Sequence, residues 1–145
     1  MNANRQVDPQ RVARMIAIWA LTVFFGVAIF LLWERWTGAN TEGCPLSSVS
    51  PLINCQRVLT SAGSRIFFVP LVLWGALWAA GGVALAFDHS SKPGLARLWT
   101  AVGIFGLLWA IGHEVLLATL CAWCTLLQAL AVLAMWMHYR MRAKT

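Results

Sequence analysis

The sequence predicts an all-α integral membrane protein, a four-transmembrane-helix bundle with a short amphipathic helix in the first extracytoplasmic loop. Composition is the first observation that supports this class. Of the 145 residues 60% are hydrophobic and only 11% are charged, whereas about 25% of residues are charged in a typical soluble domain. The second observation is a set of long apolar runs, and the third is the uneven distribution of the basic residues between them.

Four apolar runs are long enough to cross a bilayer, whose hydrocarbon core of about 30 Å requires roughly 20 apolar residues in a helix. They cover residues 15–33, 67–87, 98–118 and 121–139. We therefore expect a single domain over residues 1–145, with residues 34–66 as the loop between the first two helices. The first run is longer than the core of a secretory signal and lacks a suitable cleavage region after it, so we expect a retained helix.

The basic residues predict the orientation of the bundle. If both termini are cytoplasmic, eight of the 11 basic residues lie on the cytoplasmic side and three lie outside, as the positive-inside rule requires. The eight are Arg5, Arg11, Arg14, Lys92, Arg97, Arg140, Arg142 and Lys144, and the three are Arg35, Arg57 and Arg65. The net charge of +6 thus reflects topology, with the lipid bilayer as the partner. It predicts no nucleic-acid binding, since no basic stripe is present.

All four cysteines fall on the outer side in this topology. Cys44 and Cys55 lie in the first loop, and Cys121 and Cys124 form a CxxC motif that opens the fourth helix. The outer side is the oxidising one in bacteria and in the secretory pathway, where disulfides form and persist. The CxxC motif therefore lies at the membrane boundary in a compartment that favours disulfide chemistry.

A CxxC motif serves haem attachment, zinc binding or redox chemistry. Haem attachment requires a histidine directly after the second cysteine, where this chain has Thr125. A four-cysteine zinc site is disfavoured because the two loop cysteines are eleven residues apart, so we expect no metal. Structural disulfides remain an alternative. Redox chemistry is favoured because the start of a helix lowers the pKa of a thiol, and Thr119 is placed to cap that helix.

The loop pair also has a helical context. Ser50 and Pro51 are typical of an N-cap and a first helical position, and Leu52, Cys55 and Leu59 then share one face at helical spacing. We expect a short helix on the membrane surface with Cys55 on its apolar side. Cys44 should remain in exposed chain, where it can meet a partner.

These features resemble the vitamin K epoxide reductase family. The resemblance covers nearly the whole chain and depends most on the order of the four cysteines, on the loop sequence NCQRVLTSAGSRIFF, and on Ser61, six residues after Cys55. It implies that Cys44 and Cys55 are a shuttle pair, that Cys121 exchanges with Cys55, and that Cys124 is nearest the quinone.

The resemblance also implies the partners. Electrons would come from a separate thioredoxin-like protein, DsbA-like or PDI-like, because no such domain follows residue 139 in this chain. The electrons would pass to a quinone such as menaquinone, ubiquinone or vitamin K. A bacterial inner or plasma membrane is favoured over the endoplasmic reticulum. Gln128 stands where the vertebrate enzymes have a tyrosine, so a thiol oxidase is favoured over an epoxide reductase, which stays open as an alternative.

Three residues are predicted to bind the quinone: Ser61, His113 and Gln128. Gln128 lies one helical turn after Cys124 on the same face and can hydrogen-bond a quinone oxygen. His113 is our candidate proton donor because its ordinary pKa is near neutrality. Its neighbour Glu114 is expected at a hydrated helix end. We expect Trp74, Trp78 and Trp109 to serve in packing.

Overall fold

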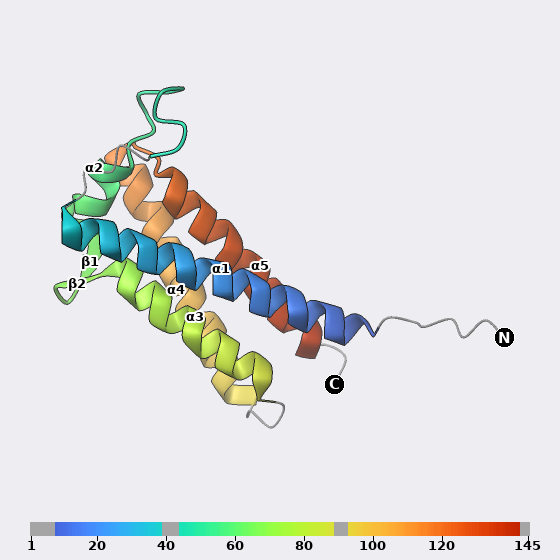
Figure 1. Ribbon diagram of the computed structural model, residues 1–145. Coiled ribbons are helices and arrows are strands. Elements are labelled where there is room, and N and C mark those ends of the chain that lie inside the picture. The colour runs from blue at the N-terminus through green and yellow to red at the C-terminus, as the bar shows by residue number, and fades with distance from the viewer. Residues whose placement is uncertain (1–7, 39–43, 89–92, 143–145) are drawn as a thin grey trace.

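Four helices lie along one another in the computed structural model, which describes residues 8–38, 44–88 and 93–142 (Figure 1). They are α1 (Pro9–Thr37), α3 (Leu71–Phe87), α4 (Pro93–Leu117) and α5 (Ala122–Arg142). Helix α1 packs against both α3 and α5, and α4 contacts the same two helices. Among the described residues, α1, α4 and α5 are long and apolar enough to cross a membrane. Helix α3 is equally apolar but has 17 residues, a length of about 26 Å.

Helix α1 extends beyond the predicted run at both ends, where it is capped. Helix α1 begins at Pro9, and the carboxylate of Asp8 accepts a hydrogen bond of 3.0 Å from the backbone N–H of Gln10. A carboxylate that accepts from a free N–H is a standard helix start, with proline favoured at the first position. The helix ends at Gly38, whose φ of 64° is the left-handed conformation typical of glycine after a helix.

The loop contains a six-residue helix, α2 (Cys55–Thr60), which begins later than the sequence predicts. The predicted start at Ser50 is wrong, because the Ser50 hydroxyl accepts from the Leu52 N–H within a turn. Asn54 caps α2 instead, with its side-chain oxygen 2.9 Å from the Arg57 N–H. As a result Leu52 is exposed, while Cys55 remains on the buried face.

A small hairpin follows α2 and delays the start of the next helix. After the 3-10 turn η1 (Ala62–Ser64), strands β1 (Arg65–Ile66) and β2 (Val69–Pro70) pair antiparallel. The turn between them places Phe67 and Phe68 at φ values of 50° and 65°. The predicted helix start at Phe67 is therefore wrong, because α3 begins at Leu71 after this turn.

Small residues allow the helices to approach closely. Ala79 has no exposed surface, and a Cβ atom added to Gly82 would lie 2.5 Å from the ring of Trp99. Trp78 and Trp99 stack with ring centroids 4.5 Å apart, and each indole N–H donates to the other residue's carbonyl at 2.9 Å. Helix association in membranes depends on such close packing, so this contact joins α3 to α4.

The start of α1 and the end of α5 lie at one end of the bundle, and the loop with α2 lies at the other (Figure 1). Basic side chains gather at the first end, where Arg11, Arg14 and Arg142 surround a cavity with His138. Of the basic residues used to predict the topology, Arg5, Lys92 and Lys144 fall outside the described residues. The four cysteines therefore lie at the end opposite to this basic cluster.

Candidate functional site

Two backbone hydrogen bonds dock the loop on the turn that precedes α5. The Asn54 N–H donates to the Leu120 carbonyl at 2.9 Å, and the Leu120 N–H donates to the Leu52 carbonyl at 2.8 Å. This pairing is parallel, between Ile53 and Leu120. The next residues along the two segments include Cys55 and Cys121, so the register brings one cysteine of each pair together.

The four cysteines meet in one cluster. Cys55, Val58 and Cys121 form its buried centre, with Cys44 and Cys124 packed against it. Cys55 and Cys121 have no exposed surface. The burial of Cys55 agrees with the predicted orientation of its side chain, although the helix that carries it starts later.

Cys44 and Cys55 form a disulfide with their Cα atoms 5.7 Å apart. Cys44 is half-buried, less accessible than the sequence predicted, and lies in the turns that lead into α2. The other end of α2 is held by α1, because the Arg35 guanidinium donates to the Leu59 carbonyl at 2.7 Å. The loop disulfide is therefore anchored at both ends of α2, with Cys44 as its more accessible sulfur.

Cys121 is the N-cap of α5. Its carbonyl accepts from the Thr125 N–H at 2.9 Å, and its sulfur accepts from the Cys124 N–H at 3.2 Å. The expected cap, Thr119, does not serve, because its hydroxyl donates to the Leu117 carbonyl. A hydrogen bond from the Cys124 thiol lowers the pKa of the Cys121 thiol, and burial partly opposes this effect. A lower pKa raises the fraction of Cys121 present as thiolate and makes Cys121 a better leaving group.

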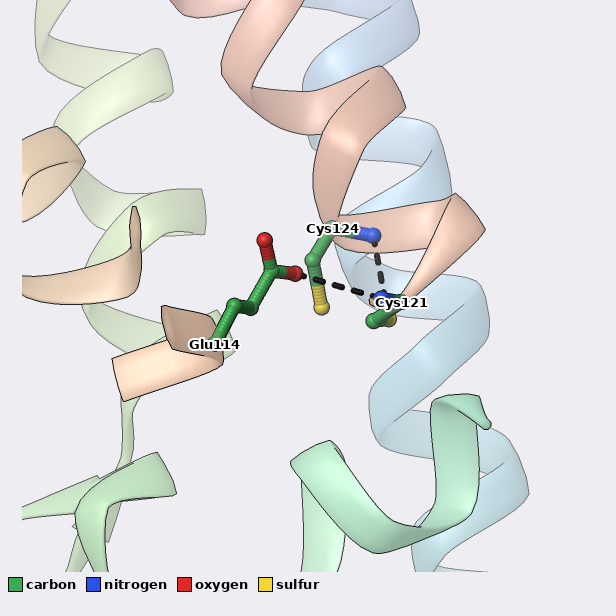
Figure 2. Close-up of side chains that lie close together, drawn as sticks. All are labelled: Glu114, Cys121 and Cys124. Atoms are coloured by element: carbon green, nitrogen blue, oxygen red, sulfur yellow. Dashed lines mark hydrogen bonds between the residues drawn. The ribbon is translucent and has the colours of Figure 1, made fainter. Parts of the chain in front are cut away.

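Glu114 is buried beside the CxxC motif, contrary to the expected hydrated helix end. Figure 2 shows its carboxyl group pointing from α4 toward Cys121 and Cys124. One oxygen accepts from the Cys121 N–H at 3.4 Å, and the other accepts from the side-chain amide of Gln128 at 3.3 Å. Only 5% of Glu114 is exposed. The turn with Ala118 at φ 48° returns the chain so that Glu114 faces α5.

The donor atoms of Glu114, Cys121 and Cys124 lie within 4.8 Å of one another. Such a group has the geometry to hold a metal ion, and it also suits proton-coupled thiol chemistry. A site built from all four cysteines does not form here, because Cys44 and Cys55 are bonded to each other. The expectation that the protein needs no metal remains a prediction.

An apolar cavity of about 360 Å³ lies between the helices beside the CxxC motif. Cys124 and Gln128 line it from α5, and Trp74 and Trp78 line it from α3. Both indole N–H groups are engaged, by the carbonyls of Ile66 and Trp99. Apolar walls with few polar groups are typical of sites for hydrophobic ligands. Trp74 and Trp78, which were predicted to serve in packing, thus also line this cavity.

Ser61 and His113 contact each other and not this cavity. The Ser61 hydroxyl donates to the Val58 carbonyl at 2.6 Å, and it lies 2.5 Å from Nε2 of His113. Gly63 makes room for the His113 ring, because a Cβ atom there would lie 2.2 Å from Nδ1. Of the three predicted quinone residues, only Gln128 lines the cavity.

Sequence reasoning missed two residues that shape the site, Asn54 and Arg35, and placed Glu114 at a hydrated helix end. Glu114 carried a usable signal, since a carboxylate inside an apolar run is costly and often functional. The cap at Asn54 was not predicted because the sequence at Ser50 resembles a helix start more closely.

Comparison with protein families supports one assignment. The model of the vitamin K epoxide reductase family matches residues 14–139, which include all four cysteines and most of the chain. Neither the curated proteins nor the solved structures gave a match. The family is one of membrane oxidoreductases, in keeping with the apolar helices and the clustered cysteines. On this match, the chain belongs to the vitamin K epoxide reductase family.

Proposed function

We propose that the protein is a quinone-dependent thiol-disulfide oxidoreductase that supports disulfide bond formation. Electrons pass from a separate thioredoxin-like protein to Cys44 and Cys55, then to Cys121 and Cys124, and finally to a quinone. The observation that carries the proposal is that both cysteine pairs share one cluster, at whose edge Cys124 lines an apolar cavity.

The first step is reduction of the loop disulfide. A thiolate of the partner attacks Cys44, which is the more accessible sulfur because Cys55 has no exposed surface. The partner's second thiolate resolves the mixed disulfide. The partner leaves oxidised, and Cys44 and Cys55 are left as thiols with two electrons gained.

The second step is exchange between the pairs. The Cys55 thiolate attacks Cys121 of the Cys121–Cys124 disulfide and releases Cys124. Cys44 then attacks Cys55, which restores the loop disulfide and frees Cys121. The final state has an oxidised loop pair and two free thiols in the CxxC motif, as in this structure.

The third step is oxidation of the CxxC motif by the quinone, which accepts two electrons and two protons. The described residues supply a suitable place for it, since Cys124 and Gln128 both line the apolar cavity. Gln128 offers an amide to a quinone oxygen. Ser61 and His113, which lie outside this cavity, support the loop through their mutual hydrogen bond.

We further propose that both termini are cytoplasmic, that all four helices cross the membrane, and that the cysteines face the oxidising side of a bacterial inner membrane. The basic residues Arg11, Arg14 and Arg142 at the end opposite to the cysteines support this orientation. On the oxidising side, a partner that has just oxidised a substrate protein returns in its reduced form and can reach Cys44.

An anaerobic assay on the purified protein tests the function. Reduced thioredoxin-like protein and a water-soluble quinone are supplied together, and quinol is followed by absorbance. We expect quinol formation that requires all four cysteines. A parallel reaction contains the quinone epoxide in place of the quinone. A protein that reduces only the epoxide would belong with the vertebrate type, and one that reduces neither compound would have structural disulfides alone.

A further inference from the structure

Among the described residues that line the proposed quinone cavity, Cys124 carries the one titratable side chain. Cys124 and Gln128 supply its polar side-chain groups together with two tryptophan N–H groups that are already bonded. Reduction of a quinone to a quinol requires two protons as well as two electrons. Cys121 does not line the cavity, so a group just behind the cavity wall is needed to carry its proton to the quinone.

Glu114 is the group in that position. Its carboxyl lies within 4.8 Å of the donor atoms of Cys121 and Cys124, and its second oxygen is 3.3 Å from the Gln128 amide. It thus reaches the thiols that lose protons and the amide that would hold the quinone oxygen. Among the described residues, the titratable groups that interact electrostatically with this carboxyl are the two thiols and His113, its neighbour on α4.

We infer that Glu114 carries protons from the Cys121–Cys124 thiols to the quinone beside Gln128. This inference rests on the proposed function. Each carboxylate oxygen accepts one N–H and retains a lone pair, so the group can take a proton without losing its hydrogen bonds. Oxidation of the two thiols forms one S–S bond and releases two protons and two electrons, and the quinone takes all four. Glu114 passes the protons singly and ends as it began.

A purely structural role would give Glu114 one task, to hold the turn through the Cys121 N–H. A glutamine can perform that task, because its amide oxygen accepts the same bond and the Gln128 amide can rotate to match its nitrogen. The glutamine cannot carry a proton. Glu114→Gln therefore separates the two roles, and Glu114→Asp keeps a carboxyl that is set back by one methylene.

The experiment uses the purified full chain with its CxxC motif reduced and an excess of water-soluble quinone. Thiol oxidation is followed by stopped flow across a range of pH, for the wild type, Glu114→Gln, Glu114→Asp and the control Glu34→Gln. Glu34 lies on α1 and does not line the cavity of Cys124 and Gln128. Quinone binding is measured separately through tryptophan fluorescence.

We expect Glu114→Gln to bind quinone normally but to oxidise its thiols roughly a hundredfold or more slowly, the usual contribution of acid–base catalysis. The pH profile of its rate should also lose the part caused by the carboxyl group and keep the part caused by the thiols. Glu114→Asp should recover part of the rate, and Glu34→Gln should match the wild type. Equal rates for Glu114→Gln and wild type at every pH would overturn the inference while leaving the proposed function intact. A wild type that transfers no electrons to quinone would remove both.

A second measurement covers the case in which Glu114→Gln fails to fold. Time-resolved infrared spectra of the wild type, taken while quinone oxidises the thiols, should show a transient carboxylic acid band that shifts in Glu114→Asp. Oxidation without any transient carboxyl change would overturn the inference.

Discussion

Asn54 should control the rate of exchange between the two cysteine pairs. While the loop disulfide is intact, it holds Cys55 in place. Once a partner has reduced it, α2 depends on its own cap, in which the Asn54 side chain accepts from the Arg57 N–H at 2.9 Å. The helix has only six residues, so besides its contacts with Arg35 and Leu120 it depends on this cap to stay folded.

The size of the effect follows from that one bond. Replacing an asparagine cap with alanine costs about 0.5–2 kcal/mol. If the whole cost falls on the docked state of the reduced loop, exchange slows by roughly two- to thirtyfold, since about 1.4 kcal/mol corresponds to a factor of ten. The backbone bond from the Asn54 N–H to the Leu120 carbonyl is retained in the variant.

The assay reduces the loop pair with a partner protein, stops the reaction at intervals with a maleimide that adds mass, and separates the products on a gel. Asn54→Ala should be slow, and Asn54→Ser, which restores a good cap, should match the wild type. Direct reduction of the CxxC motif by a small dithiol should be unchanged in both. Equal exchange rates in Asn54→Ala and Asn54→Ser would refute the role of the cap.

Four further predictions concern topology, relay, quinone binding and packing. A membrane-impermeant maleimide should label Cys44 in intact reduced cells, and labelling only after lysis would reverse the topology. Cys55→Ser should block transfer from the partner but leave the CxxC motif able to reduce quinone when a small dithiol is supplied; loss of both activities in a folded protein would contradict the relay. Gln128→Leu removes a hydrogen bond worth about 0.5–1.5 kcal/mol, so the quinone Kd should rise roughly two- to tenfold in a fluorescence titration, and an unchanged Kd would place the quinone elsewhere. Gly82→Ala places a Cβ atom 2.5 Å from the ring of Trp99; the midpoint of thermal unfolding should fall by an amount equivalent to about 1–3 kcal/mol, and an unchanged midpoint would show that the ring can move.

The sequence predicted the helical class and the family because those depend on features that are local in the chain. Apolar runs and the order of the cysteines can be counted directly. Helix starts were less predictable where local signals competed. Ser50 with Pro51 looked like a better start than Asn54, yet the bond between the Asn54 N–H and the Leu120 carbonyl decides the outcome.

The site was harder to predict because it depends on a contact between distant segments. No residue near Glu114 in the sequence shows that the turn at Ala118 will bring the CxxC motif back beside its carboxyl. His113 as proton donor stays a prediction, and its contact with the Ser61 hydroxyl on the loop could not be foreseen from the sequence. Gln128 was predictable because a helix places it on the same face as Cys124.

Electron transfer between the two cysteine pairs depends on contact between Cys55 and Cys121, which both lie in the centre of the cysteine cluster. Two double variants test that contact by mild oxidation followed by mass spectrometry of the linked peptides. Cys44→Ser with Cys124→Ser leaves Cys55 and Cys121, and we expect them to form a disulfide rapidly. Cys44→Ser with Cys121→Ser leaves Cys55 and Cys124, which should link slowly. Faster linkage in the second variant would show that electrons enter the CxxC motif through Cys124 and would contradict the relay.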